Sequence, residues 1–360
     1  MTRGIDARRA ALRGLGATLA GLTVLAAPPV VAQTAGGNGA LTAMEETQPQ
    51  MRPEALPARR VPALRAELAA RAAAERPRVF GGEPAAPGQY PFQVALLFAD
   101  YLTDSAASNR DAQFCGGSLI APDWVLTAAH CIDDWDGPMP ADEMRVLSGA
   151  TRLDEGRRVE VAEVIMHPDY DRMNFDNDIG LIRLAEPVEA PSVRLARTTP
   201  EGGVVRVIGW GMMETGAFPE TLMQVEVELQ TNAVCNDGIR TIYARDLADI
   251  LREADWRMRF GESAVHDAVG LLKPAMDDPV SPRMVCAGYE AGMRDACYGD
   301  SGGPLFAQTD DGVIQHGVVS WGEGPRDAFA ACGHAMAYGV YARVESFIDW
   351  IEAETGLRID

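Results

Sequence analysis

The stretch that decides both fold and chemistry is Asp295-Ala-Cys-Tyr-Gly-Asp-Ser-Gly-Gly-Pro304. Its serine, Ser301, lies among glycines, which allow close approach of a substrate carbonyl because they carry no Cβ. The N–H groups of Gly299 and Ser301 can point at one spot, as in an oxyanion hole for acyl transfer. Asp-Ser-Gly-Gly is also typical of an ordinary turn. The stretch therefore predicts a nucleophile only if a base and an orienting carboxylate lie elsewhere in the chain.

Both partners are found upstream. Of the five histidines, only His130 lies in a small-residue segment pinned by a cysteine, Leu126-Thr-Ala-Ala-His-Cys131. Asp178, in Asn177-Asp-Ile-Gly-Leu-Ile-Arg-Leu184, comes directly before an apolar strand pattern, where a carboxylate can be buried against an imidazole. The predicted catalytic residues are therefore His130, Asp178 and Ser301, in that order along the chain.

These motifs resemble those of the trypsin (chymotrypsin-like) serine protease family, from Val79 to about Leu357. The resemblance implies an all-β fold of two six-stranded antiparallel β-barrels with the triad at their junction. The hydrophobic pattern agrees, because short apolar runs separated by turn residues are typical of barrel folds. We expect strands over residues 92–98, 117–120, 124–127, 159–166, 179–184, 204–208, 223–229, 317–321 and 340–344, and one C-terminal helix over 344–353.

Six cysteines, an even number, are typical of an exported protein in an oxidising compartment. The resemblance implies the disulfides Cys115–Cys131, Cys235–Cys286 and Cys297–Cys332. No Cys-x-x-Cys pair occurs, so we expect no structural metal site.

The N-terminal residues 1–32 are typical of an export signal. Basic residues precede an apolar run over 15–25, and small residues at 30–32 offer a cleavage site. The run is short for a membrane span, and we expect none in the mature chain. Arg8-Arg9 leaves export by the twin-arginine route open. Whether the destination is the periplasm or the extracellular medium also stays open.

Residues 33–78 are expected to form a flexible linker and pro-segment, with a helix over 62–76 that carries Leu64 and Leu68 on one face. The protease domain then spans 79–360. Residues 1–78 hold eleven arginines and six acidic residues, so the net charge of −20 divides into +5 before Val79 and −25 after it. Such an acidic domain repels nucleic acid and favours cationic substrates, although the charge also serves solubility.

Activation is predicted at Arg78-Val-Phe-Gly-Gly82. The resemblance implies that cleavage after Arg78, by another protease or by the enzyme itself, frees Val79. Its ammonium would then pair with Asp300, which precedes the nucleophile. Phe80 departs from the family pattern, because it is larger than the usual second residue of the new N-terminus.

A pocket for a basic side chain is predicted from Asp295, which stands six residues before Ser301. The resemblance places Asp295 at the pocket base and Gly322 and Gly339 in its walls. Ala296 lacks the hydroxyl that often helps to bind lysine, so we expect arginine to be preferred over lysine, also because a guanidinium pairs with a carboxylate through two hydrogen bonds.

The substrate backbone is expected to pair with the edge formed by Ser320 and Trp321. The predicted function is therefore a serine endopeptidase that acts on protein or peptide substrates containing Arg or Lys. The alternative is a catalytically silent or tightly gated binding or regulatory module of the same family.

Several stretches depart from the plain pattern. Residues 236–282 form a long insertion, in which 239–260 has near-helical spacing of apolar residues, beside the expected cleft. Gly324 to Cys332 lengthens one pocket wall and could narrow the entrance to the pocket, and Asp100–Gln113 is a lesser insertion on the leaving-group side. The resemblance allows a sodium site near Tyr338 without deciding whether one exists, and we do not predict a calcium site.

Overall fold

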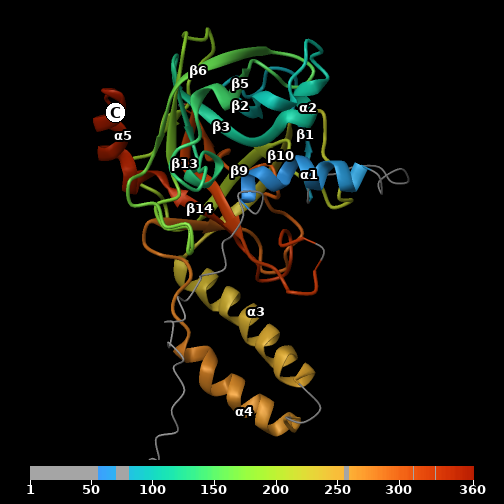
Figure 1. Cartoon of the computed structure of the whole chain (residues 1–360). Coiled ribbons are helices and arrows are strands. Elements are labelled where there is room, and N and C mark those ends of the chain that lie inside the picture. Colours follow the sequence, from blue (N-terminus) through green and yellow to red (C-terminus); the bar gives the residue numbers. More distant parts are fainter. Residues whose placement is uncertain (1–55, 70–80, 255–258, 311, 329) are drawn as a thin grey trace, which may run out of the picture. The chain divides into compact units, whose positions relative to one another are not determined.

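The computed structural model describes residues 56–69, 81–254, 259–310, 312–328 and 330–360 (Figure 1). The predicted export signal, the cleavage site at Arg78 and the terminus at Val79 lie outside the described residues. So does the part of the expected pro-segment helix beyond Ala69.

The first barrel closes in the order β2-β3-β4-β7-β6-β5. Strand β2 is buried along its whole length. In β6, buried and exposed positions alternate over residues 159–162, because one face of the strand meets solvent. The bounds are β2 (Gln93–Phe98), β3 (Gln113–Ala121), β4 (Trp124–Thr127), β5 (Met144–Ser148), β6 (Arg157–Met166) and β7 (Gly180–Leu184).

The second barrel closes in the order β9-β10-β11-β14-β13-β12, with β12 pairing back to β9. Two short strands extend it, because β1 (Glu83–Pro84) pairs with β10 and β8 (Arg194–Leu195) pairs with β13. The bounds are β9 (Gly203–Gly209), β10 (Met223–Gln230), β11 (Met284–Ala287), β12 (Pro304–Thr309), β13 (Gly312–Gly322) and β14 (Gly339–Arg343). The predicted all-β fold of two six-stranded antiparallel barrels is confirmed.

Aromatic and polar contacts join the two barrels. The ring of Phe306 on β12 lies edge-on to that of Phe92, with 5.6 Å between their centroids. Ser118 on β3 donates a hydrogen bond of 2.7 Å to the Oε1 atom of Gln315 on β13, and both residues are buried. The junction is therefore a packed interface, and loops from both barrels are fixed relative to each other there.

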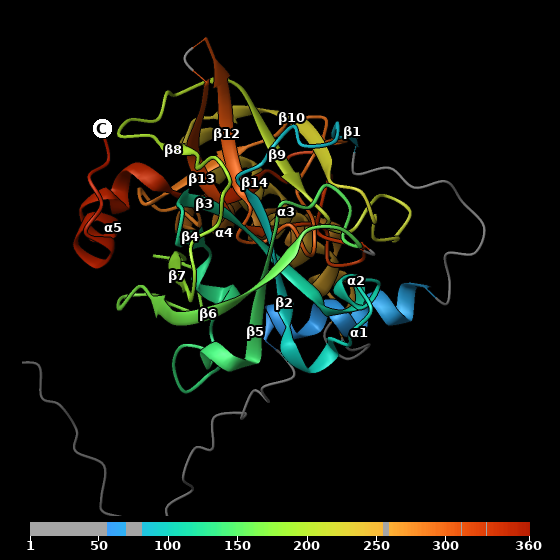
Figure 2. The same cartoon turned by 90° about the horizontal axis from the view of Figure 1, so that it is seen from above.

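Helices are few among the described residues and lie outside the barrels (Figures 1 and 2). The C-terminal helix forms as predicted, with a 3-10 turn leading into α5. The α-helices are α1 (Pro57–Ala69), α2 (Ser108–Ala112), α3 (Asn232–Glu253), α4 (Glu262–Leu272) and α5 (Ile348–Thr355). The 3-10 turns are η2 (Ala99–Tyr101), η3 (Ala129–Cys131), η4 (Ala141–Glu143), η5 (Lys273–Ala275) and η6 (Val344–Phe347).

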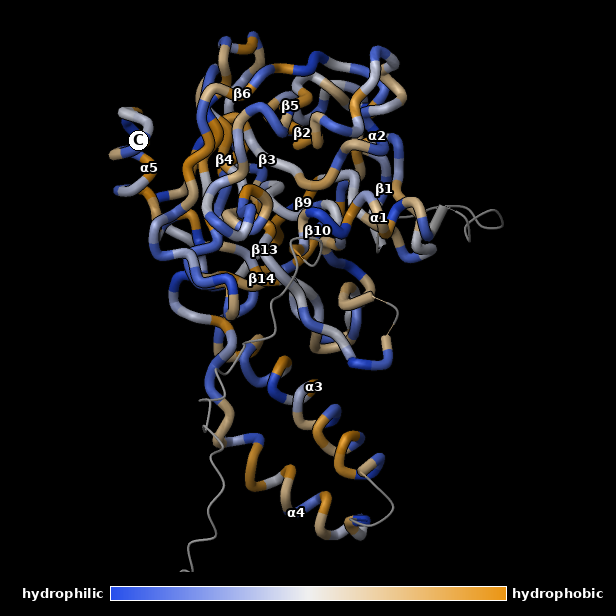
Figure 3. The backbone as a smooth tube through the Cα atoms, viewed as in Figure 1, coloured by the Kyte–Doolittle hydropathy of each residue, from blue (hydrophilic) through white to orange (hydrophobic). Residues whose placement is uncertain are grey.

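The predicted insertion is helical but differs in detail. Helical spacing is expected over 239–260, whereas α3 begins at Asn232 and ends at Glu253. The Thr231 hydroxyl caps α3 by accepting a hydrogen bond from the Val234 N–H. Helix α4 packs alongside α3, and the two form a helical hairpin. A Cβ on Gly238 would lie 2.7 Å from the Met336 carbonyl oxygen, so only glycine allows α3 to approach the second barrel so closely. Figure 3 shows hydrophobic and hydrophilic residues interleaved along both helices.

The pro-segment helix differs from the prediction at its start. The sequence pattern predicts a helix that begins at Pro62, but α1 begins at Pro57 and contains Pro62 in its interior. An interior proline removes one helical hydrogen bond and disfavours the helix. Burial of Ala58, Val61 and Pro62 against the protease domain compensates, because these positions recur on one helix face. Tertiary packing therefore overrides the local preference.

Candidate active site

The imidazole of His130 is held by a buried carboxylate. His130 lies in η3 after β4, and Asp178 lies just before β7; β4 and β7 are paired neighbours in the first barrel. Asp178 Oδ2 is 2.7 Å from His130 Nδ1, and its Oδ1 accepts a hydrogen bond of 2.8 Å from the His130 backbone N–H. Ser320 also donates to Asp178 Oδ2. The carboxylate thus fixes the ring so that Nδ1 carries the proton and Nε2 can act as a base.

The segment around Ser301 is fixed to both barrels. The Ser301 carbonyl accepts a hydrogen bond of 2.7 Å from the N–H of Gly116 on β3. Gly299 and Gly302 have φ of 98° and 79°, and a Cβ on Gly302 would lie only 2.2 Å from Thr127 Oγ1. Glycine is therefore required on both sides of Ser301. Ser301 and His130 line one cleft with a volume of about 570 Å³.

A carboxylate lies at the base of this cleft. Asp295 is almost fully buried, and its Oδ2 accepts a hydrogen bond of 3.0 Å from the Gly333 N–H. Its Oδ1 has no hydrogen-bond partner among the described residues. Burial raises the pKa of Asp295 to about 7, because the charged form is desolvated.

The residues predicted to shape the pocket are brought together around Asp295. A Cβ on Gly339 would lie 2.6 Å from Asp295 Oδ1, so a larger residue there would fill the space in front of the carboxylate. The same cleft is lined by Ala296, Ser320, Trp321, Gly322 and Gly339.

Asp300, next to Ser301, is a second buried carboxylate. Its oxygens accept hydrogen bonds of 2.7 Å from the Gly211 N–H and 2.9 Å from the Cys297 N–H. Burial raises the pKa of Asp300 to about 6. Among the described residues no cation pairs with it, so the charge of this carboxylate is balanced by backbone dipoles only.

The structure contains the three disulfides that the resemblance implies, Cys115–Cys131, Cys235–Cys286 and Cys297–Cys332. Within the described part of the chain, Cys115, His130 and Cys131 lie close enough together to suggest a metal site. Both cysteines are disulfide-bonded and offer no thiolate, so this cluster does not fit a metal ion. No described helix is both long and apolar enough to cross a membrane.

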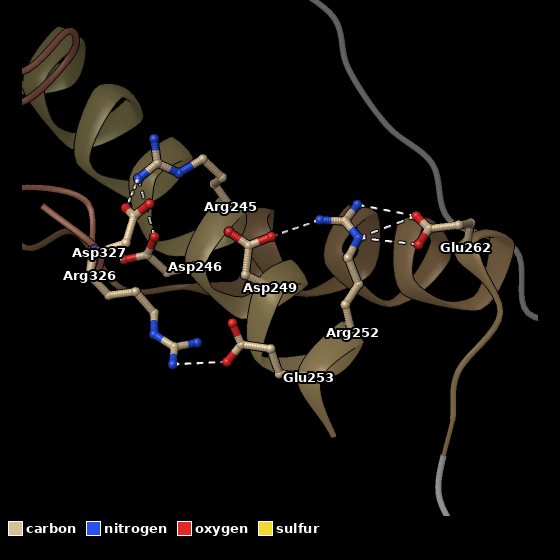
Figure 4. A network of polar contacts seen from close by, with 8 residues as sticks. All are labelled: Arg245, Asp246, Asp249, Arg252, Glu253, Glu262, Arg326 and Asp327. Carbon is tan, nitrogen blue, oxygen red and sulfur yellow. Dashed lines mark hydrogen bonds and ion pairs between the residues drawn. The ribbon is translucent and has the colours of Figure 1, made fainter. Parts of the chain in front are cut away.

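The insertion and the lengthened pocket wall form one unit, which the sequence did not indicate. Tyr243 on α3 lines the cleft and donates a hydrogen bond of 3.0 Å to Glu323 Oε2, beside the pocket wall. The Arg326 N–H donates to Asp246 Oδ2 at 3.0 Å, and the Arg326 guanidinium lies 3.1 Å from Glu253 (Figure 4). These contacts hold the pocket wall against α3 at Arg326.

The pro-segment helix also reaches the cleft. Pro57, Arg60, Val61 and Leu64 of α1 line it together with His130 and Ser301. The sequence carries no signal for this placement, because nothing in the helix pattern indicates a position relative to the protease domain.

Comparison with known proteins agrees with this geometry. The model of the Trypsin family matches residues 79–351. The mouse (Mus musculus) protein Tryptase is 32% identical, over 77% of this chain and 88% of its own length. The Vitellin-degrading protease of Bombyx mori is 30% identical, over 78% of this chain and 88% of its own. Mannan-binding lectin serine protease 1 of Mus musculus is 30% identical over 78% of this chain, but the chain spans only 36% of that longer protein.

Proposed function

Because this chain belongs to the trypsin family of serine endopeptidases, which act on protein or peptide substrates, we propose that it is an exported zymogen. Once activated, it hydrolyses the peptide bond after arginine, with lysine as a weaker alternative. The observation that carries the specificity is the unpaired Oδ1 of Asp295 at the base of the cleft.

In the proposed reaction, Ser301 Oγ attacks the substrate carbonyl while His130 Nε2 takes its proton. His130 then returns the proton to the leaving amine, and the resulting acyl-enzyme is hydrolysed by the same steps with water as the nucleophile. Asp178 holds the imidazole and stabilises its charged form, which its two hydrogen bonds to His130 support. The N–H groups of Gly299 and Ser301 bind the oxyanion.

The proposed preference for arginine follows from the buried carboxylate. A carboxylate with one unpaired oxygen in a low-dielectric pocket gains most from a cation that also donates hydrogen bonds. A guanidinium offers a planar pair of donors, whereas an ammonium is a point charge that needs further oxygen ligands. Ala296 supplies none from its side chain.

The proposed activation rests on Asp300. Its carboxylate is buried without a cation among the described residues, and a buried charge is costly until it is paired. Cleavage after Arg78 supplies an ammonium at Val79. The three disulfides support export to an oxidising compartment.

The test measures hydrolysis of matched Arg, Lys, Phe and Ala peptide amides before and after a trace of trypsin, with N-terminal sequencing of the product. We expect activity on Arg to appear only with a new Val79 terminus, and the Arg78→Gln chain to stay inactive. Asp295→Ser should reduce Arg cleavage at least about 100-fold, because the substrate cation loses its buried partner.

Full activity of the Arg78→Gln chain would overturn the zymogen proposal, and unchanged preference in Asp295→Ser would overturn the pocket assignment. Silence on every substrate despite a Val79 terminus would favour the binding-module alternative.

A further inference from the structure

The helix α1 packs on the protease domain through one face. Ala58, Val61, Pro62 and Arg65 are all buried, at the spacing of one helical stripe. This face contacts β3, α2 and η3, all of which belong to the first barrel and its loops. Figures 1 and 2 both show α1 beside α2.

Arg65 ties the helix to the oxyanion segment. Its guanidinium donates a hydrogen bond of 2.9 Å to the Gln113 carbonyl, and it also donates to Gln113 Oε1 and to the Arg110 carbonyl. The Gln113 side chain in turn donates a hydrogen bond of 2.9 Å to the Gly299 carbonyl. The guanidinium lies 4.5 Å from the centre of the Phe218 ring. A single side chain of the pro-segment thus reaches the backbone beside Ser301 through one intermediate.

The helix covers part of the reaction cleft. Val61 Cγ1 lies 3.6 Å from the point where a Cβ on Gly299 would be, so it packs against the oxyanion segment. Asp295 and the edge at Ser320 lie in the half of the cleft expected to take the acyl part of the substrate. α1 instead packs on β3, η3 and α2, and α2 lies in the stretch 100–113 that is expected on the leaving-group side.

Charge favours this contact. Arg59 pairs with Asp134 and lies 3.3 Å from Glu143, and both carboxylates belong to the first barrel. Without the export signal, residues 33–78 hold seven arginines and five glutamates and carry +2, whereas the rest of the chain carries −25. Opposite net charges speed association and hold the partners together at low ionic strength. Residues 33–78 contain no cysteine, so no disulfide can tether them after cleavage.

Desolvation of Arg65 limits how much its hydrogen bonds contribute to the contact. The acceptors of Arg65 among the described residues are carbonyl and amide oxygens rather than carboxylates. Burial of a cation without a carboxylate partner is costly, and burial lowers the pKa of Arg65 to about 9. Such a helix is expected to bind reversibly.

We propose that α1 is a removable cap on the leaving-group half of the cleft. Resting on the proposed activation after Arg78, the proposal states that residues 56–69 stay bound as a separate peptide after that cut. They then exclude substrates that extend beyond the scissile bond, until the peptide dissociates or is degraded. Cleavage and uncapping are thus two separate steps in the appearance of activity.

The test uses the full chain with Ser301→Ala, in which residues 75–78 are replaced by Ile-Glu-Gly-Arg so that factor Xa cuts before Val79 without making the pro-segment acidic. After the cut, size-exclusion chromatography and mass spectrometry show whether the pro-segment remains with the protease domain. We expect co-elution at low ionic strength. Val61→Asp should raise the dissociation constant about 100-fold and separate the two, because a charge is buried at the contact.

Ala63→Asp is the matched control, since it places the same charge on an exposed position of the same helix. It should co-elute like the parent chain. Arg65→Gln is a second variant that adds no charge, and it should weaken binding by removing the contacts to Gln113 and Arg110. Separation of the unsubstituted pro-segment, or equal behaviour of Val61→Asp and Ala63→Asp, would overturn the cap.

A second measurement separates failure of the cap from failure of the proposed function. With Ser301 intact, the cut enzyme should gain activity on dilution toward a peptide extended beyond the scissile bond, and less toward a short amide. Co-elution together with no proteolysis of either substrate at any dilution would leave the cap standing and refute the proposed cleavage after arginine. Proteolysis after arginine with no co-elution and no dilution effect would support the proposed function and overturn the cap.

Discussion

The two halves of the cleft differ in how their buried charges are matched. On the acyl side, Asp295 keeps one oxygen without a partner among the described residues. On the leaving-group side, Arg65 from the pro-segment is buried with oxygen acceptors provided by Gln113 and Arg110. One half thus has an anionic site that suits a substrate cation, and the other is covered by a helix that a buried cation of the chain anchors. Under the two proposals, the pocket selects the substrate and the helix controls access.

The largest expected effect tests the triad, on which both halves depend. Asp178→Asn should lower kcat about 10⁴-fold, because an amide cannot stabilise the charged imidazole and favours the wrong tautomer of His130. The measurement is hydrolysis of an Arg amide by the activated enzyme. Asp176→Asn is the matched control, since Asp176 contacts Ser281 and Arg283 rather than His130. Equal losses in the two variants would contradict the role of Asp178.

The chemistry around Ser301 could be predicted from the sequence because it depends on local motifs. Ser301 needs glycines at 299 and 302 for backbone reasons, and these leave a visible signature. His130 and Asp178 are recognisable because each adjoins an apolar strand. The strands β5, β11 and β12 escape prediction, since they are short and β12 ends in polar residues, but the fold class can be predicted without them.

The position of α1 could not be predicted for a physical reason. Its buried face includes Arg65 and Pro62, which are residue types expected on a surface or at a helix start. The contact between α3 and the pocket wall at Arg326 is likewise hidden, because it rests on charge pairs such as Arg326–Glu253 between segments far apart in sequence. Burial of polar side chains by a partner segment leaves no periodic pattern to detect.

The next effect sharpens the acyl half of the comparison. Because burial raises the pKa of Asp295 to about 7, a guanidinium must displace a proton to bind below that pH. The association constant of phenylguanidine should therefore rise up to tenfold per pH unit below about pH 7 and level off above it. The measurement is calorimetry on activated Ser301→Ala enzyme freed of its pro-segment, in two buffers that differ in ionisation enthalpy.

Two variants test the origin of this pH dependence. Asp295→Ser should bind weakly and with little pH dependence. His130→Ala should keep the pH dependence, which separates Asp295 from the histidine that lines the same cleft. A pH dependence that disappears in His130→Ala and persists in Asp295→Ser would show that the displaced proton leaves the histidine and not the pocket carboxylate.

The smallest expected effect concerns Asp300. It tests whether the Val79 ammonium that activation frees pairs with the buried Asp300 carboxylate. Its folded-state pKa of about 6 is above the usual value for aspartate, so between about pH 4 and pH 6 the native state binds more protons than the unfolded state. Stability of the uncleaved chain should therefore fall as pH rises through this window. A pKa raised from about 4 to about 6 corresponds to roughly 3 kcal/mol in the free energy of unfolding.

Urea denaturation of the Ser301→Ala chain at pH 4 and pH 7 measures this difference. Asp300→Asn should reduce it, whereas Asp310→Asn, at an exposed turn, should not. After cleavage before Val79 the difference should also shrink, because a paired carboxylate no longer has a raised pKa. If the cleaved and uncleaved chains gave the same pH dependence, the Val79 ammonium would not be the partner of Asp300. The two buried anions near Ser301 would then both remain without a cation from the chain.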